Sequence, residues 1–273
     1  MGECRDVLDR SAPAPDLTLA YGPLADHVAD IWLPSRETLP RLAPLVILWH
    51  GGFWRSAFDR HHLGPMAADL AARGYVVATP EYRRTGDGGG WPTTFLDVAA
   101  AADLLPAAIL NEAPRFADPA RIVYAGHSAG GHLAVWAALR DRLPADAPGR
   151  IERLPAISGI LALAPVLDLR EAYRLDLDGG AVAALLGDSP DDVPGRYAAT
   201  DPSLLDVPSA KLTIVHGDGD GRVPIAMSRD YCAAMGGSLI EIPDDDHFAV
   251  INPLSEAWDT VVRTLAELAR KLG

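Results

Sequence analysis

Apolar residues along this chain fall into two patterns that follow each other repeatedly. Short runs without alternation, such as 44–49 and 75–78, are typical of strands that are buried on both faces. Segments with apolar residues three and four positions apart come after them, and Gly74 follows one such segment as a helix stop signal. The succession of buried strands and helices predicts an α/β protein with a mostly parallel central sheet and helices on both faces.

The same patterns place the individual elements. Buried strands are expected at 44–52, 75–83, 121–128, 159–169, 211–218 and 238–247. Helices are expected at 61–74, 95–110, 129–139, 224–237 and 253–272, with Pro106 kinking the second or breaking it in two. Residues 16–23 and 27–34 alternate apolar and polar positions between Gly and Pro, which predicts a peripheral antiparallel pair.

Two segments do not follow this rhythm. Residues 1–16 are polar and contain prolines, and we expect a loose N-terminal arm there. Residues 169–208 are polar and rich in Pro and Asp, with one short helical piece at 181–187. An insertion of this length predicts a small lid-like segment over the carboxyl edge of the sheet. The whole chain, 1–273, is interpreted as a single domain.

Composition narrows the function classes. The formal net charge of −13 and the lack of a Lys/Arg cluster argue against binding to nucleic acid. The two cysteines form no C-x-x-C pair, and no secretory signal or membrane span is apparent, so we expect a cytoplasmic protein without a membrane partner. No metal or other cofactor is expected, and the oligomeric state stays open, a homodimer included.

One serine, Ser128, lies in a sequence motif typical of catalytic nucleophiles. Gly126-His127-Ser128-Ala129-Gly130 matches G-x-S-x-G between a buried strand and a helix. In that context the serine sits on a strained turn, with its hydroxyl raised above the sheet edge. A plain turn with a capping serine would not require glycines at both ends. We therefore predict that Ser128 is a nucleophile, which needs a base to become reactive.

The partners of such a serine follow it in the order acid, then histidine. Beyond residue 200 the histidines are His216 and His247, and His247 follows the last strand on a loop at the carboxyl edge. We predict His247 as the base and Asp220 as the acid that orients it. Asp218 and, one strand earlier, Asp168 are the alternatives for the acid.

Backbone donors for an oxyanion are expected on a second loop. His50-Gly51-Gly52-Phe53-Trp54 follows a buried strand, and its glycines allow the backbone to approach a substrate closely. We predict an oxyanion hole made by the amides of Gly52 and Phe53 together with that of Ala129. The candidates for the substrate pocket are Gly51, Trp54, Tyr82, His127 and Phe248, although core packing is an equally ordinary role for large aromatic residues.

Together these motifs resemble the α/β-hydrolase superfamily, and within it the arylformamidase-like (kynurenine formamidase-like) and esterase/lipase branch. The resemblance covers about 30–270, through the segments HGGFW, GHSAGGHLA, HGDGDGRVP and DHF. It implies an α/β-hydrolase fold and metal-free hydrolysis of a small-molecule ester or N-formyl aryl amide.

We therefore predict a serine hydrolase that cleaves short-chain or aryl carboxylic esters through an acyl-enzyme. An arylformamidase acting on substrates such as N-formylkynurenine is the alternative, because both reactions use the same groups. A non-catalytic ligand-binding module on the same fold is an alternative of another class.

Overall fold

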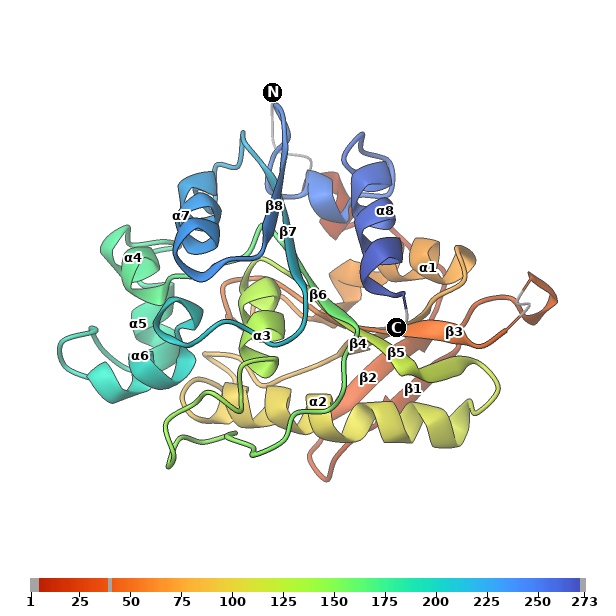
Figure 1. Ribbon diagram of the computed structural model, residues 1–273, viewed down its shortest axis with the longest axis horizontal. Coiled ribbons are helices and arrows are strands. Elements are labelled where there is room, and N and C mark those ends of the chain that lie inside the picture. Colours follow the sequence, from red (N-terminus) through yellow and green to blue (C-terminus); the bar gives the residue numbers. More distant parts are fainter. Residues whose placement is uncertain (1–4, 39–40, 271–273) are drawn as a thin grey trace.

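The computed structural model describes residues 5–38 and 41–270, and one eight-stranded sheet runs through its centre (Figure 1). The strands are β1 (Leu17–Ala20), β2 (Val28–Trp32), β3 (Ala43–Trp49), β4 (Val76–Pro80), β5 (Ala117–His127), β6 (Gly159–Leu163), β7 (Leu212–Gly217) and β8 (Ser238–Ile242). Their spatial order is β1-β2-β4-β3-β5-β6-β7-β8. The strands from β4 to β8 in this order pair in parallel, whereas β2 pairs antiparallel with both β1 and β4. The predicted sheet and its peripheral antiparallel pair are confirmed.

Helices cover both faces of this sheet. They are α1 (Gly64–Ala72), α2 (Thr93–Glu112), α3 (Ala129–Ala137), α4 (Leu169–Arg174), α5 (Ala181–Leu186), α6 (Pro194–Thr200), α7 (Ile225–Met235) and α8 (Trp258–Leu268). One buried cluster holds side chains of α2, α3 and α7, and a second holds those of α1 and α8. Strand β3 serves both, since Leu45 and Ile47 belong to the first cluster and Val46 and Leu48 to the second. Such two-sided burial explains why this strand shows no polar alternation.

Helix α2 runs unbroken through Pro106, so the expected break is wrong. A proline lacks the N–H that would bond to the carbonyl four residues earlier, here that of Ala102. The Tyr124 hydroxyl, on β5, lies 3.4 Å from this carbonyl and donates to it. Helix α2 is long and apolar enough to cross a membrane, but 56% of its most apolar window is buried inside the protein, as in a core helix.

The N-terminal arm is ordered from residue 5 onward, which corrects the expectation of a loose segment for the described part of 1–16; residues 1–4 lie outside the description. It opens with the short 3-10 helix η1 (Arg5–Leu8). The Arg10 guanidinium donates to Asn252 Oδ1 at 2.6 Å, and Trp32 Nε1 donates to the Pro13 carbonyl at 3.1 Å. The last two residues of the helix expected at 253–272 also lie outside the described chain.

The insertion at 169–208 holds α4, α5 and α6 plus the 3-10 helix η4 (Pro202–Leu204), not a single helical piece. Asp168 caps α4 by accepting from the Glu171 N–H at 2.7 Å, and Pro194 occupies the first turn of α6. These short helices gather beside α3 and α7 (Figure 1). The helical piece expected at 181–187 is α5, whereas α4 and α6 were missed because each offers only about two turns of apolar periodicity.

Candidate active site

Ser128 lies at the sharp turn between β5 and α3. Its φ of 57° and ψ of −120° are strained for a residue with a side chain. A Cβ at Gly126 would collide with the backbone of Gly130, and one at Gly130 would collide with the backbone of Trp49. The two glycines are therefore required by close packing of the turn, and they leave Ser128 at the carboxyl edge of the sheet.

The acid and the histidine come from the loops after β7 and β8. His247 Nδ1 lies 2.6 Å from Asp220 Oδ2. The other oxygen, Oδ1, accepts from the N–H groups of Arg222 at 2.7 Å and Val223 at 2.8 Å. The two alternative acids are engaged elsewhere: Asp218 accepts from the Asp244 N–H at 2.6 Å, and Asp168 caps α4.

A second imidazole, which the sequence did not reveal, holds the same carboxylate. His216 Nε2 lies 3.0 Å from Asp220 Oδ2, and its Nδ1 lies 2.8 Å from the Ser228 hydroxyl. Burial alone would raise the pKa of Asp220, but the hydrogen bonds from His216 and His247 outweigh it and keep that pKa well below its usual range. The acid is therefore ionised when it faces His247.

Ser128 and His247 line one pocket, although no hydrogen bond joins their side chains within the described part of the chain. Such contacts are often loose in free enzymes and tighten when substrate binds. The backbone of His247 is held by His127, whose Nε2 lies 2.9 Å from the His247 carbonyl oxygen. Burial moves the pKa of His127 well below its usual value, so this imidazole is neutral and donates to that carbonyl.

The loop after β3 supplies backbone donors. Gly52, Phe53 and Trp54 have φ angles of 109°, 49° and 56°, a left-handed run that turns the backbone sharply. Among the described residues, the N–H groups of Gly52, Phe53 and Ala129 donate to no protein acceptor. Unpaired N–H groups near a nucleophile are what an oxyanion hole requires.

Side chains of this loop pack against the core behind the pocket. His50 Nε2 lies 2.9 Å from Glu81 Oε1, and the Tyr82 ring stacks on the His50 ring at 4.3 Å. Trp54 is fully buried and packs against the ring of His132. Gly51, Trp54 and Tyr82 do not line the pocket, so their predicted contact with substrate is corrected. The sharp turn directs the Trp54 side chain into the core.

The pocket at Ser128 brings together predicted and unpredicted residues. Of the residues named from the sequence, Gly52, Phe53, His127, Ser128, His247 and Phe248 line it; Arg5, Leu8, Phe58, His62 and Arg222 line it as well. No residue of 169–208 belongs to this lining, so a lid role of that insertion stays a prediction. The contribution of the arm had no sequence signal, because η1 carries no motif and reaches the site only through the fold.

Metal-binding residue types are not clustered as a metal site in the described parts of the chain. Within 5–38 and 41–270, no group of three or more His, Cys, Asp or Glu side chains is arranged as a metal site. The ionisable groups around Ser128 are instead committed to each other, as the His216–Asp220–His247 chain shows.

Comparison with known proteins decides the family. The model of the BD-FAE family matches residues 29–235, which is most of the chain. The chain belongs to the BD-FAE family. Among curated relatives of this BD-FAE protein, esterase LipQ of Mycobacterium tuberculosis is 28% identical over 84% of the chain, but the match spans only 56% of LipQ. A kynurenine formamidase of Danio rerio is 24% identical over 96% of the chain and 84% of its own length.

Solved structures share the fold of this BD-FAE chain. Esterase B of Lactobacillus rhamnosis superposes with a TM-score of 0.75 over 95% of the chain and 88% of its own length, at 18% identity. A truncated carbohydrate esterase from gut microbiota gives 0.74 over 98% of the chain and 99% of its own, at 19% identity. The α/β-hydrolase fold and the resemblance to the esterase and arylformamidase-like branch are confirmed.

Proposed function

We propose that this protein is a serine hydrolase that cleaves short-chain or aryl carboxylic esters through an acyl-enzyme. The observation that carries the proposal is the strained Ser128 in one pocket with His247, whose Nδ1 lies 2.6 Å from a buried carboxylate. Relatives named as esterases support the same chemistry. No cofactor is needed, because the chain itself provides nucleophile, base and oxyanion donors.

The proposed reaction runs in two halves. Ser128 Oγ attacks the ester carbonyl while His247 Nε2 takes its proton, and Asp220 holds Nδ1–H and stabilises the imidazolium. The oxyanion points to the N–H groups of Gly52, Phe53 and Ala129; one such donor is typically worth about 3–4 kcal/mol in the transition state. His247 then protonates the departing alcohol, and a water molecule activated by His247 releases the acid from Ser128.

Labelling with a fluorophosphonate probe tests this proposal. We expect one adduct on Ser128 in the folded protein and none in Ser128→Ala, along with loss of p-nitrophenyl acetate hydrolysis by at least about a thousandfold. A folded wild-type protein that takes no label at Ser128 would instead support the ligand-binding alternative.

An arylformamidase is the second candidate, because two fish relatives named kynurenine formamidase align over more than nine-tenths of this chain. Ester and formamide cleavage use the same residues, so kcat/KM values for N-formylkynurenine and for phenyl acetate, measured side by side, decide between them. A higher value for the formamide would reverse the order of the two proposals. We further propose a cytoplasmic location, because Cys232 is a free thiol, as is usual in a reducing compartment.

A further inference from the structure

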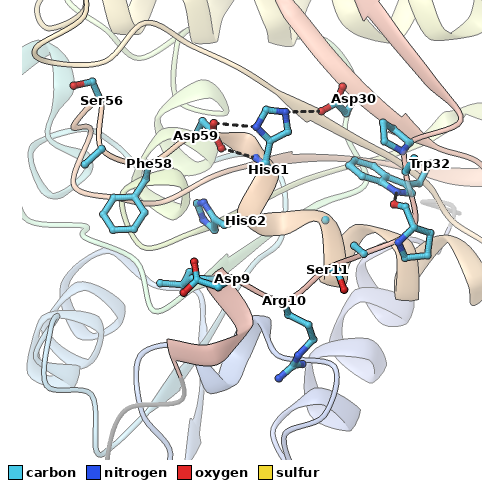
Figure 2. Close-up of a pocket in the computed structure, with 17 residues that line it drawn as sticks. Asp9, Arg10, Ser11, Asp30, Trp32, Ser56, Phe58, Asp59, His61 and His62 are labelled. Carbon is cyan, nitrogen blue, oxygen red and sulfur yellow. Dashed lines mark hydrogen bonds and ion pairs between the residues drawn. The ribbon is translucent and has the colours of Figure 1, made fainter.

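A cavity of about 510 Å³ lies beside the serine pocket, between the N-terminal arm and the segment 56–62 (Figure 2). Leu8, Phe58 and His62 line both spaces, so the two adjoin. The serine pocket itself offers only about 30 Å³, whereas pockets for small ligands usually measure roughly 300–1,000 Å³. A short acyl group fits at Ser128, but any larger part of the substrate has to extend past the three shared residues.

We propose that this cavity receives the larger half of the substrate, and that it selects a group that donates hydrogen bonds and carries no negative charge. This inference rests on the proposed hydrolase function and adds a substrate class to it.

Hydrogen-bond acceptors form part of the cavity wall. Asp9, Asp30 and Asp59 line it, together with the hydroxyl groups of Ser11 and Ser56. Burial opposes ionisation of Asp59, but hydrogen bonds from His61 lower its pKa below the usual value, so this carboxylate stays charged. Asp9 is exposed and has no ion-pair partner among the described residues. Both oxygens of Asp30 and of Asp59 already accept hydrogen bonds from the protein, so a ligand hydroxyl or ammonium group would donate to Asp9.

The arginine side chains at the cavity wall already have hydrogen-bond or ion-pair partners. The Arg10 guanidinium pairs with Asp6 and donates to Asn252, and Arg60, next to the cavity, donates to Asp30 at 2.8 Å. Burial lowers the pKa of His62 to about 3, so its ring adds no cation where the two spaces meet. Asp30 is paired with Arg60, and Asp59 is hydrogen-bonded to His61, which leaves Asp9 without a counter-charge among the described residues. A carboxylate entering this cavity would meet that anion and no free cation, which disfavours it.

Apolar side chains also line the cavity, among them Ala12, Pro13, Ala14 and Pro15 of the arm and Ala57. Figure 2 shows Phe58 and Asp9 near His62 at one end of the cavity and Trp32 at the other. Trp32 is only 5% exposed, and its indole N–H is bound to the arm. An alkyl chain can lie against these apolar residues, but it offers the Asp9 carboxylate no donor. Covering that carboxylate without a hydrogen bond would be costly.

The first test fills the cavity. Ala57 is exposed and lines the cavity but not the serine pocket. Ala57→Trp therefore narrows the cavity and leaves the lining of the serine pocket unchanged. Ala233→Trp, on the exposed face of α7, is the matched control. We expect Ala57→Trp to reduce kcat/KM for 4-hydroxybutyl butyrate at least about tenfold, a loss of ~1.4 kcal/mol, and to change methyl butyrate less than about twofold.

The second test reads the charge preference with esters of the same acyl group. We expect wild-type kcat/KM to fall in the order 4-hydroxybutyl, pentyl, 3-carboxypropyl butyrate. Asp9→Lys should raise the value for the carboxypropyl ester and lower that for the hydroxybutyl ester, which reduces their ratio about tenfold.

Each failure points to a different conclusion. Equal rates of wild type and Ala57→Trp on all esters, with thermal melts unchanged, would mean that the cavity holds no part of the substrate. A wild-type preference for the carboxypropyl ester would overturn the assigned substrate class. In both cases the proposed function would stand as long as Ser128→Ala is inactive; full activity of Ser128→Ala would reject that function itself.

Discussion

Chemistry at single residues depends here on which neighbours each side chain holds. Asp218 and Asp220 are two positions apart on the same loop, yet they face different partners. Asp218 accepts from a backbone N–H of the loop after β8, whereas Asp220 lies between two imidazoles. Because their partners differ, substitutions of Asp218 and Asp220 can be compared to test whether Asp220 is the acid.

We predict that Asp220→Asn lowers kcat for aryl esters by about 10⁴-fold, because the amide no longer holds His247 in the required tautomer. Asp218→Asn should lower kcat less than about tenfold, since its loss affects only a loop contact. Steady-state kinetics on p-nitrophenyl acetate measure both. Similar losses in the two variants would show that Asp220 is not the acid.

Among the helices, α3 connects Ser128 to the core, because it begins directly after that residue and is buried along its length. His132 lies on this helix, fully buried, with Nε2 donating to the Thr200 carbonyl at 2.8 Å. Burial lowers the pKa of His132 from the usual 6.5 to about 4. Between pH 4 and pH 6.5, His132 is protonated in the unfolded chain and neutral in the folded chain. The contribution of His132 to stability is therefore complete above pH 6.5 and is lost as the pH falls toward 4.

We predict that His132→Gln flattens the decline of unfolding free energy between pH 6.5 and pH 4.5, by up to about 3 kcal/mol relative to wild type. Glutamine keeps a donor for the Thr200 carbonyl but does not titrate. Urea unfolding at several pH values measures the effect, and the exposed His61→Gln is the control. Parallel curves for wild type and His132→Gln would contradict the assignment.

For the whole molecule, the net charge of −13 creates a field that every charged ligand meets. Anionic esters are repelled at low ionic strength, while neutral esters are not affected. Screening shortens the range of this field from roughly 30 Å at 0.01 M salt to about 8 Å at 0.15 M.

We therefore expect kcat/KM for 3-carboxypropyl butyrate to rise about threefold or more between about 0.01 and 0.15 M salt. The value for 4-hydroxybutyl butyrate should stay within twofold. Initial rates at constant pH give both numbers. A flat response of the anionic ester would show that the long-range field does not reach the site.

Local patterns in the sequence determined the strand and helix order, the turn at Ser128 and the order of acid and histidine. These depend on periodicity, on glycines that permit close packing, and on short-range geometry, all of which are written in adjacent residues. The contact between His247 and Asp220 could be predicted because the loops that carry them follow neighbouring parallel strands, whose carboxyl ends share one edge.

Only the tertiary structure decided what surrounds these groups. It brought Arg5 and Leu8 to the serine pocket, set His216 on the acid, and turned Trp54 into the core although its neighbour Phe53 lines the pocket. It also divided 169–208 into three helices and kept them out of the pocket lining. Contacts between residues hundreds of positions apart, such as Arg10 with Asn252, leave no local periodicity, and packing of the whole chain alone selects them.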